Sequence, residues 1–203
     1  MSLAKTLAAA LLMTASASAF AQGPNPSEIS INSISFAGTG CPAGTVAGNI
    51  APDAKAFTLL FDSYVAEAGP GVSLSEGRKA CQLNVDLHIP QGWSYTLFTL
   101  DTRGFLNLEP GTSAVQSNKY YFQGSLSGPT LSSQYIGPRV GDYTNRDNIG
   151  VAALVWSPCG LNRALNVQTS VRVAAGGGRR AMATVDSIDG EFKLIYGVQW
   201  RRC

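Results

Sequence analysis

The stretch that decides the fold is ACQLNVDLHIP, residues 80–90, because apolar and polar side chains alternate along it without a break. The apolar set falls on every second position and consists of Cys81, Leu83, Val85, Leu87 and Ile89. The residues between them are the polar Gln82, Asn84, Asp86 and His88. A period of two is typical of a β-strand with one face in the core and the other in water. We therefore expect a half-buried strand here.

Runs of the same kind recur along most of the chain. Alternating or continuously apolar β-rich stretches occupy residues 28–36, 55–67, 94–108, 113–128, 132–144, 151–156, 164–175, 182–189 and 191–203. Turn-forming residues interrupt them as GPG at 69–71, EPG at 109–111, SGP at 127–129, GGG at 176–178 and SIDG at 187–190. The Ala- and Gly-rich stretch 42–56 is expected to be a loop over the sheet, and VAALVW, 151–156, a central buried strand.

Strands at near-regular spacing, without a convincing amphipathic helix, predict an all-β protein. We expect a single-domain antiparallel β-sandwich, and the pattern fits a jelly-roll-like arrangement or a flattened barrel equally well. The length of 203 residues suits one domain with a sizeable core.

The first residues have the layout of a secretory signal peptide. Lys5 precedes an apolar run over residues 7–13, and Ala19-Phe20-Ala21 fits the small-x-small cleavage pattern. We expect a signal peptide over residues 1–21, a flexible lead-in over 22–28 and the β-sandwich over 29–203. The protein is therefore expected to be secreted, and no later stretch is long and apolar enough to cross a membrane.

The composition limits the classes of partner. The net charge is +2, charged residues make up 14% of the chain, and no basic stripe is present, so we expect no nucleic-acid partner. His88 is the only histidine and the four cysteines are widely spaced, so no metal site is expected. The chain has no phosphate-binding glycine loop and no G-x-S-x-G sequence. No cofactor and no membrane partner are expected.

Four cysteines in an exported chain predict two disulfides. Cys41, Cys81, Cys159 and Cys203 permit three connectivities, and the sequence alone does not choose among them. We favour Cys41–Cys81 with Cys159–Cys203, because each pair closes a loop of about 40 residues. The second bridge would hold the last strand in place.

Five stretches together resemble one catalogued family. They are GTGCPAGT at 38–45, RKACQLNVDLHIPQGWSY at 78–95, KYYFQG at 119–124, VWSPCG at 155–160 and YGVQWRRC at 196–203. The chain is similar, from about residue 28 to its end, to family 4360 among the domains of unknown function, which are secreted proteins of fungi and bacteria. The resemblance implies a secreted β-rich domain whose four cysteines form structural disulfides, and it implies no activity.

Aromatic residues are the main candidates for a binding site. The residues we single out are Trp93, Tyr95, Tyr120, Tyr121 and Tyr143. Flat aromatic faces stack on the apolar faces of sugar rings, while nearby polar groups set the orientation. The competing interpretation is that these rings pack the core, although Tyr120 and Tyr121 are adjacent on a strand and must face opposite ways. We expect a non-catalytic domain that binds a cell-wall polysaccharide or an extracellular protein.

Two alternatives stay open. A secreted hydrolase would use paired carboxylates, drawn from Asp86, Asp101, Asp142, Asp147, Asp186 and Asp189. We assign no catalytic residue, because nothing in the spacing brings two of these carboxylates to a catalytic distance. A structural subunit would assemble through exposed strand edges.

Overall fold

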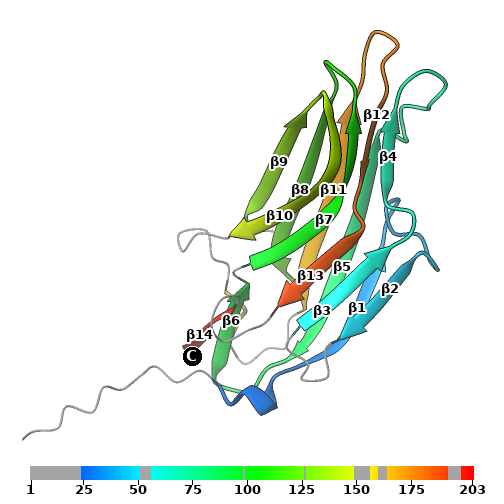
Figure 1. Cartoon of the computed structure of the whole chain (residues 1–203). Helices are drawn as coiled ribbons and strands as arrows, with labels where there is room; N and C mark the ends of the chain where they lie inside the picture. The colour runs from blue at the N-terminus through cyan, green and yellow to red at the C-terminus, as the bar shows by residue number, and fades with distance from the viewer. Residues whose placement is uncertain are drawn as a thin grey trace, which may run out of the picture.

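The computed structural model describes residues 24–50, 56–97, 99–125, 127–148, 156–159, 164–191 and 198–203. The expected signal peptide lies outside these residues. In the expected lead-in, Pro26–Glu28 form a short 3-10 turn. The domain consists of two packed antiparallel sheets and a small two-stranded sheet (Figure 1). Across the described ranges, no helix has the length and apolar character needed to span a membrane.

The first sheet has five strands in the order β1-β5-β11-β8-β9. Their bounds are β1 (Ser30–Ala37), β5 (Arg78–His88), β11 (Leu165–Ala174), β8 (Ser113–Phe122) and β9 (Thr130–Ile136). The stretch quoted first lies in β5, and its predicted alternation is confirmed. Cys81, Leu83, Val85 and Leu87 are buried, whereas His88 is exposed.

The second sheet has seven strands. Their bounds are β2 (Val46–Ile50), β3 (Ala56–Phe61), β4 (Val65–Ala68), β7 (Thr99–Leu108), β10 (Arg139–Asn148), β12 (Ala181–Thr184) and β13 (Ser187–Glu191). Along one side β7 pairs with β10, and along the other side with β13 and then β12. At this change of partner a Cβ on Gly104 would collide with the carbonyl oxygen of Thr184, so only glycine fits.

The inner faces of the two sheets enclose one core. Leu83, Val85 and Val167 of the first sheet and Leu59 and Ile188 of the second are fully buried in it. Among the described strands, the two sheets are separate and do not close into a barrel, so the expected all-β sandwich is confirmed.

A two-stranded sheet lies at one end of the molecule. It pairs β6 (Trp93–Leu97) with β14 (Val198–Arg202). Beyond the ladder, the amide of Cys203 donates to the carbonyl oxygen of Gly92 at 2.9 Å. The chain end is therefore tied to β6 by backbone hydrogen bonds as well as by a disulfide.

Two sequence expectations about single segments are wrong. SIDG at 187–190 was expected to turn but forms β13, a strand paired on both sides, because burial of Ile188 and two hydrogen-bonded neighbours outweigh its turn propensity. Within the expected loop 42–56, residues 46–50 form the edge strand β2, whose Val46 packs on the core. The expected buried strand at 151–156 falls outside the described residues except for Trp156.

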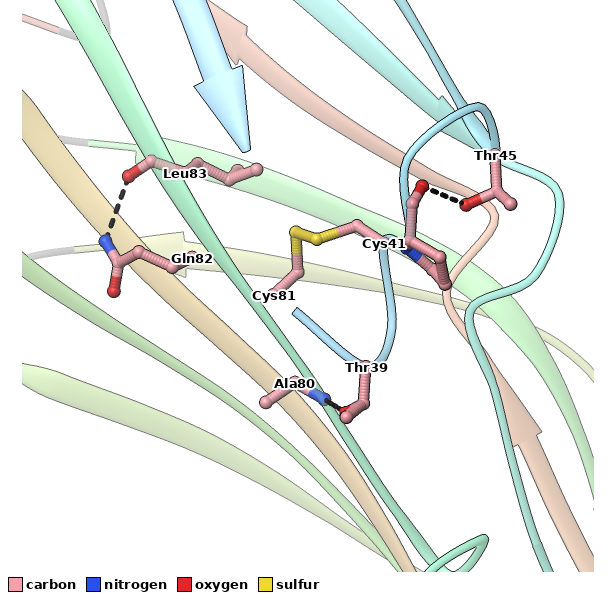
Figure 2. Close-up of a disulfide and its surroundings, with 8 residues drawn as sticks. Thr39, Cys41, Thr45, Ala80, Cys81, Gln82 and Leu83 are labelled. Carbon is pink, nitrogen blue, oxygen red and sulfur yellow. Dashed lines mark hydrogen bonds between the residues drawn. A yellow bond between two sulfur atoms is a disulfide. The ribbon is translucent and has the colours of Figure 1, made fainter. Parts of the chain in front are cut away.

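Both disulfides join the cysteine pairs that were favoured. Cys41–Cys81 and Cys159–Cys203 have Cα separations of 5.5 and 5.7 Å and close sequence separations of 40 and 44 residues. Figure 2 shows Cys81 on β5 bridged to Cys41 on the loop that follows β1. The Thr39 hydroxyl accepts from the Ala80 amide at 3.1 Å beside the bridge (Figure 2). The loop is thus fixed to β5 by covalent and hydrogen bonds together.

One end of the core is polar. Asp147 on β10 is 7% exposed, and its Oδ2 accepts from the Tyr120 hydroxyl at 2.6 Å and from Asn118 Nδ2 at 2.7 Å. Burial and the Asp147 carboxylate raise the pKa of the Tyr120 phenol far above its usual range. A buried carboxylate is costly unless it is hydrogen-bonded, and here two donors from β8 satisfy one of its oxygens.

The network continues towards the sheet edges. Gln116 Nε2 donates to Asn118 Oδ1 at 2.9 Å, and Asn145 Nδ2 donates to Gln116 Oε1 at 2.8 Å. The Tyr135 hydroxyl donates to Asn145 Oδ1. Because Tyr135 lies on β9 and Asn145 on β10, this last bond joins the edge strands of two different sheets.

Removing the Cys41–Cys81 bridge tests its share of the stability. For a 40-residue loop the chain-entropy model gives a loss of about 4 kcal/mol in the free energy of unfolding. We expect C41A/C81A to show this loss in urea unfolding followed by tryptophan fluorescence. A loss below about 1 kcal/mol would contradict a major role of the bridge in restricting the unfolded chain.

Adjacent tyrosines on β8 provide a matched test of the polar core. Tyr120→Phe removes a hydrogen bond to a buried carboxylate and is expected to cost about 2 kcal/mol of unfolding free energy. Tyr121→Phe removes a partly exposed hydrogen bond to Gln82 and should cost less than about 0.5 kcal/mol. Urea titrations of both variants measure the difference, and equal costs would refute a special contribution from the buried network.

Candidate functional site

The outer face of the five-stranded sheet carries a row of amide side chains. Gln82 and Asn84 on β5 lie directly opposite Gln168 and Asn166 on β11. Asn166 Oδ1 accepts from Asn84 Nδ2 at 3.2 Å and from Gln82 Nε2 at 3.3 Å. We call these four residues the amide strip. Mutual hydrogen bonds and burial hold the amide groups of Gln82, Asn84 and Asn166 in place, whereas Gln168 is exposed.

Tyr121 borders the amide strip on the β8 side. It lies directly opposite Asn166, and its hydroxyl donates to Gln82 Oε1 at 3.1 Å. The Lys119 ammonium is 5.7 Å from the centre of the Tyr121 ring. The face therefore combines a partly exposed aromatic ring with groups that both donate and accept hydrogen bonds.

Trp93, the second partly exposed member of the predicted set, lies in a different sheet. The Arg202 guanidinium carbon is 5.2 Å from the centre of its ring, and Arg201 lies over Trp156 at 4.5 Å. Both distances are within the range of cation–π contacts. Two arginines of β14 thus contact tryptophans: Arg202 contacts Trp93 of β6, and Arg201 contacts Trp156, three residues before Cys159 of the Cys159–Cys203 bridge.

The other three members of the predicted set are core residues. Tyr95, Tyr120 and Tyr143 are 2%, 3% and 4% exposed. Tyr95 packs edge-on against Phe122 with ring centres 5.1 Å apart, and the Tyr143 hydroxyl donates to the Thr184 carbonyl oxygen at 2.6 Å. Burial raises the pKa of each phenol above its usual range. The structure therefore leaves Trp93 and Tyr121 as the accessible aromatic groups of the set.

Most of the carboxylates considered for hydrolysis lie apart from one another, but Asp189 on β13 is directly opposite Asp101 on β7. Asp142 is exposed and Asp147 is buried, because their spacing puts them on opposite faces of β10. Asp86 accepts from Asn32 at 3.3 Å on the outer face of the first sheet. Asp186 is exposed and accepts from the Thr184 hydroxyl at 2.6 Å. Within the described residues, no three His, Cys, Asp or Glu side chains gather to hold a metal ion.

Asp101 forms the clearest ion pair of the second sheet. Arg146 donates to its two oxygens at 2.9 and 2.6 Å. These hydrogen bonds, and the charge behind them, hold the pKa of the Asp101 carboxyl below its ordinary value of 3.8. A carboxylate held in this way is suited to a structural pair rather than to proton transfer near neutral pH.

The family model described as "Domain of unknown function (DUF4360)" matches residues 27–203. The chain belongs to this family. A secreted protein of Arthroderma benhamiae is 42% identical over 181 residues, which cover 89% of this chain and 74% of that protein. The protein is secreted, and two disulfides agree with the oxidising conditions outside the cytosol.

Solved structures show only a weak likeness to the DUF4360 domain. TmCBM61, solved in complex with β-1,4-galactotriose, is 11% identical over 86% of this chain and 91% of its own, with a TM-score of 0.30. The CBM22-1–GH10 modules of the Clostridium thermocellum xylanase 10B, complexed with xylohexaose, are 7% identical over 83% and 28%, with a TM-score of 0.24. TM-scores this low carry no argument about fold or ligand.

Acid titration tests the Asp101–Arg146 pair of the DUF4360 domain. Arg146→Gln should cost less than about 1 kcal/mol of unfolding free energy at neutral pH, since the arginine is exposed. The pKa of Asp101 is depressed in the folded state, so this stabilisation is present above the unfolded-state pKa and is lost as the pH falls through the folded-state pKa. Urea titrations should therefore show wild type and R146Q converging well below pH 3.8. As the control, Arg146→Gln is introduced into the Asp101→Asn variant, where it should change the unfolding free energy little at any pH.

Proposed function

We propose that this secreted domain binds a cell-wall polysaccharide on the outer face of its five-stranded sheet, without catalysing a reaction. The observation that carries the proposal is the amide strip, bonded internally and joined to the hydroxyl of the partly exposed Tyr121. Three amide groups fixed by hydrogen bonds, with the exposed Gln168 beside them, present an array of donors and acceptors on the sheet.

The chemistry of this face matches that of sugars. Sugar hydroxyls donate and accept hydrogen bonds, as amide side chains do. A tyrosine ring offers a flat apolar surface for the C–H face of a pyranose, while its hydroxyl remains bonded to Gln82. Extended sheets suit extended polymers, because side chains of one face recur along a strand about every 7 Å. These properties favour a glycan chain lying across β5, β11 and β8.

A non-catalytic role is supported by how the carboxylates are used. Asp101 is paired with Arg146, and Asp147 is buried among donors from β8. A glycosidase needs two carboxyls facing one scissile bond, whereas Asp142 and Asp147 face opposite ways on one strand. Asp189 does lie opposite Asp101, but both oxygens of Asp101 are held by Arg146. The amide strip itself contains no carboxylate.

A retention assay on insoluble polysaccharides tests the proposal. We expect wild-type protein to be retained on at least one polymer of a panel containing cellulose, chitin, mixed β-glucan, xylan and galactan. Tyr121→Ala and Gln82→Ala should each weaken retention about tenfold, which corresponds to about 1.4 kcal/mol. Thr144→Ala, at an exposed position of the second sheet, is the matched control and should bind as wild type does.

Trp93→Ala extends the assay to the two-stranded sheet. If Trp93 is a second contact for the polymer, its replacement weakens retention while the unfolding free energy stays near that of wild type. Absence of retention on every polymer would refute the proposal. Retention that Tyr121→Ala and Gln82→Ala leave unchanged would exclude the amide strip as the site.

A further inference from the structure

A cleft opens at the end of the sandwich where two loops cross between the sheets. One loop, residues 69–77, joins β4 to β5, and the other, residues 175–180, joins β11 to β12. The two loops lie at the same end of the molecule (Figure 1) and line a cleft of about 970 Å³. This volume is in the range of about 300–1,000 Å³ that is usual for ligand sites.

The cleft is cationic. Arg78, Arg172 and Arg179 line it, and all its lining residues lie in the described part of the chain and include no acidic residue. The acid nearest in sequence, Glu76, is bonded to Lys79 at 2.7 Å. Arg78 and Arg172 therefore line one opening that has no carboxylate among its lining residues. The guanidinium of Arg179 lies next to Gly111, which is not part of the lining.

Two of these arginines are placed against each other. Arg78 and Arg172 are directly opposite in the ladder between β5 and β11, and both are exposed. Directly opposed residues on one face have Cβ atoms about 4.5–5.5 Å apart, and like charges there are destabilising. Within the described residues, neither side chain takes part in an ion pair or a hydrogen bond. An anion bound between them would remove the repulsion.

The rest of the lining consists of apolar residues, glycines and three hydroxyl residues, Thr39, Ser73 and Ser75. Val72, Leu74 and Ala174 border the cleft, and Leu74 is fully exposed. Gly177 and Gly178 adopt positive φ values of 63° and 78°, and a Cβ on either would meet open space. A site with this lining suits an anionic group carried on a compact body with apolar faces rather than a bare ion.

The cleft continues the face that carries the amide strip. Arg78 lies six residues before Asn84 on β5, and Arg172 six residues after Asn166 on β11, which is about 20 Å along the ladder. On this face of the sheet, only Ala80 lies between Arg78 and Gln82, and only Ser170 lies between Gln168 and Arg172. A chain lying on the strip would thus reach the arginines without leaving the sheet.

We propose that the cleft binds the carboxylate of a uronic acid unit, so that the polymer recognised by this domain is an acidic polysaccharide. The planar guanidinium matches a carboxylate through two parallel hydrogen bonds, and two opposed arginines hold such a group from both sides. The identity of the ligand as a glycan rests on the function proposed above, whereas the anionic character rests on the arginines.

The test compares one polymer with and without its charge. The probes are an oligogalacturonate and the same oligomer with its carboxyls methyl-esterified, titrated calorimetrically into the secreted protein. We expect the acid form to bind at least about tenfold more tightly than the ester. The double variant R78Q/R172Q should bind both forms equally, which removes the preference.

Matched controls separate the cleft from a general charge effect. The variant R103Q/R139Q removes the same charge from the second sheet and should keep the preference for the acid form. In urea unfolding R78Q/R172Q should be at least as stable as wild type, because it removes a repulsive pair. A loss of binding preference in R78Q/R172Q would therefore not be caused by unfolding of the variant.

The outcomes distinguish this inference from the proposed function. Equal binding of acid and ester forms, with binding still sensitive to Tyr121→Ala, would overturn the inference and leave the proposed function standing. Equal losses in R78Q/R172Q and R103Q/R139Q, or arginine-dependent binding of dextran sulfate as tight as that of oligogalacturonate, would overturn the assignment to a carboxylate. Arginine-dependent preference for the acid form without sensitivity to Tyr121→Ala would support the cleft and refute the amide strip as the binding face.

Discussion

The ladder between β5 and β11 is the constraint on which the rest of the structure depends. In its central part Leu83 pairs with Val167 in the core, and the next pair, Gln82 with Gln168, lies outside. A slip of one residue would exchange the two faces. The Cys41–Cys81 bridge then fixes the preceding loop to the inner face of β5. The order of the outer face is thus a consequence of the order of the core.

The sequence predicted the two strands of this ladder well, because both repeat with a period of two, but it did not predict that they pair. The prediction failed where pairing with distant strands opposes local propensity. Residues 187–190 have the composition of a turn, but they form a strand because Ile188 is buried and strands pair on both sides. The opposite orientations of Tyr120 and Tyr121 followed from their adjacency. That Tyr95 and Tyr143 are buried did not follow, since it depends on Phe122 and Thr184 far along the chain.

The candidate site was harder to predict from the sequence, for a related reason. Gln82 and Asn84 were correctly placed on the polar side of one strand, and the alternation in 164–175 places Asn166 and Gln168 likewise. Their meeting depends on the register between strands about 80 residues apart, which periodicity within either strand cannot supply. Arg78 and Arg172 meet by the same register, so a cationic pair is formed by a chain with a net charge of only +2.

Two groups of polar residues depart from the usual pattern of an apolar core and an evenly charged surface. One is satisfied by neighbouring residues of the fold, and the other is not. The carboxyl group of Asp147 lies inside the core, where Tyr120 and Asn118 donate hydrogen bonds to it. The opposed Arg78 and Arg172 receive no such compensation from the described residues, and their surroundings include the fully exposed Leu74. Natural sequences tend to concentrate uncompensated local conflicts at functional sites. The hydrogen bonds to Asp147 join β8 to β10 and so contribute to the packing. The anionic ligand that we propose for the cleft would neutralise the repulsion between Arg78 and Arg172.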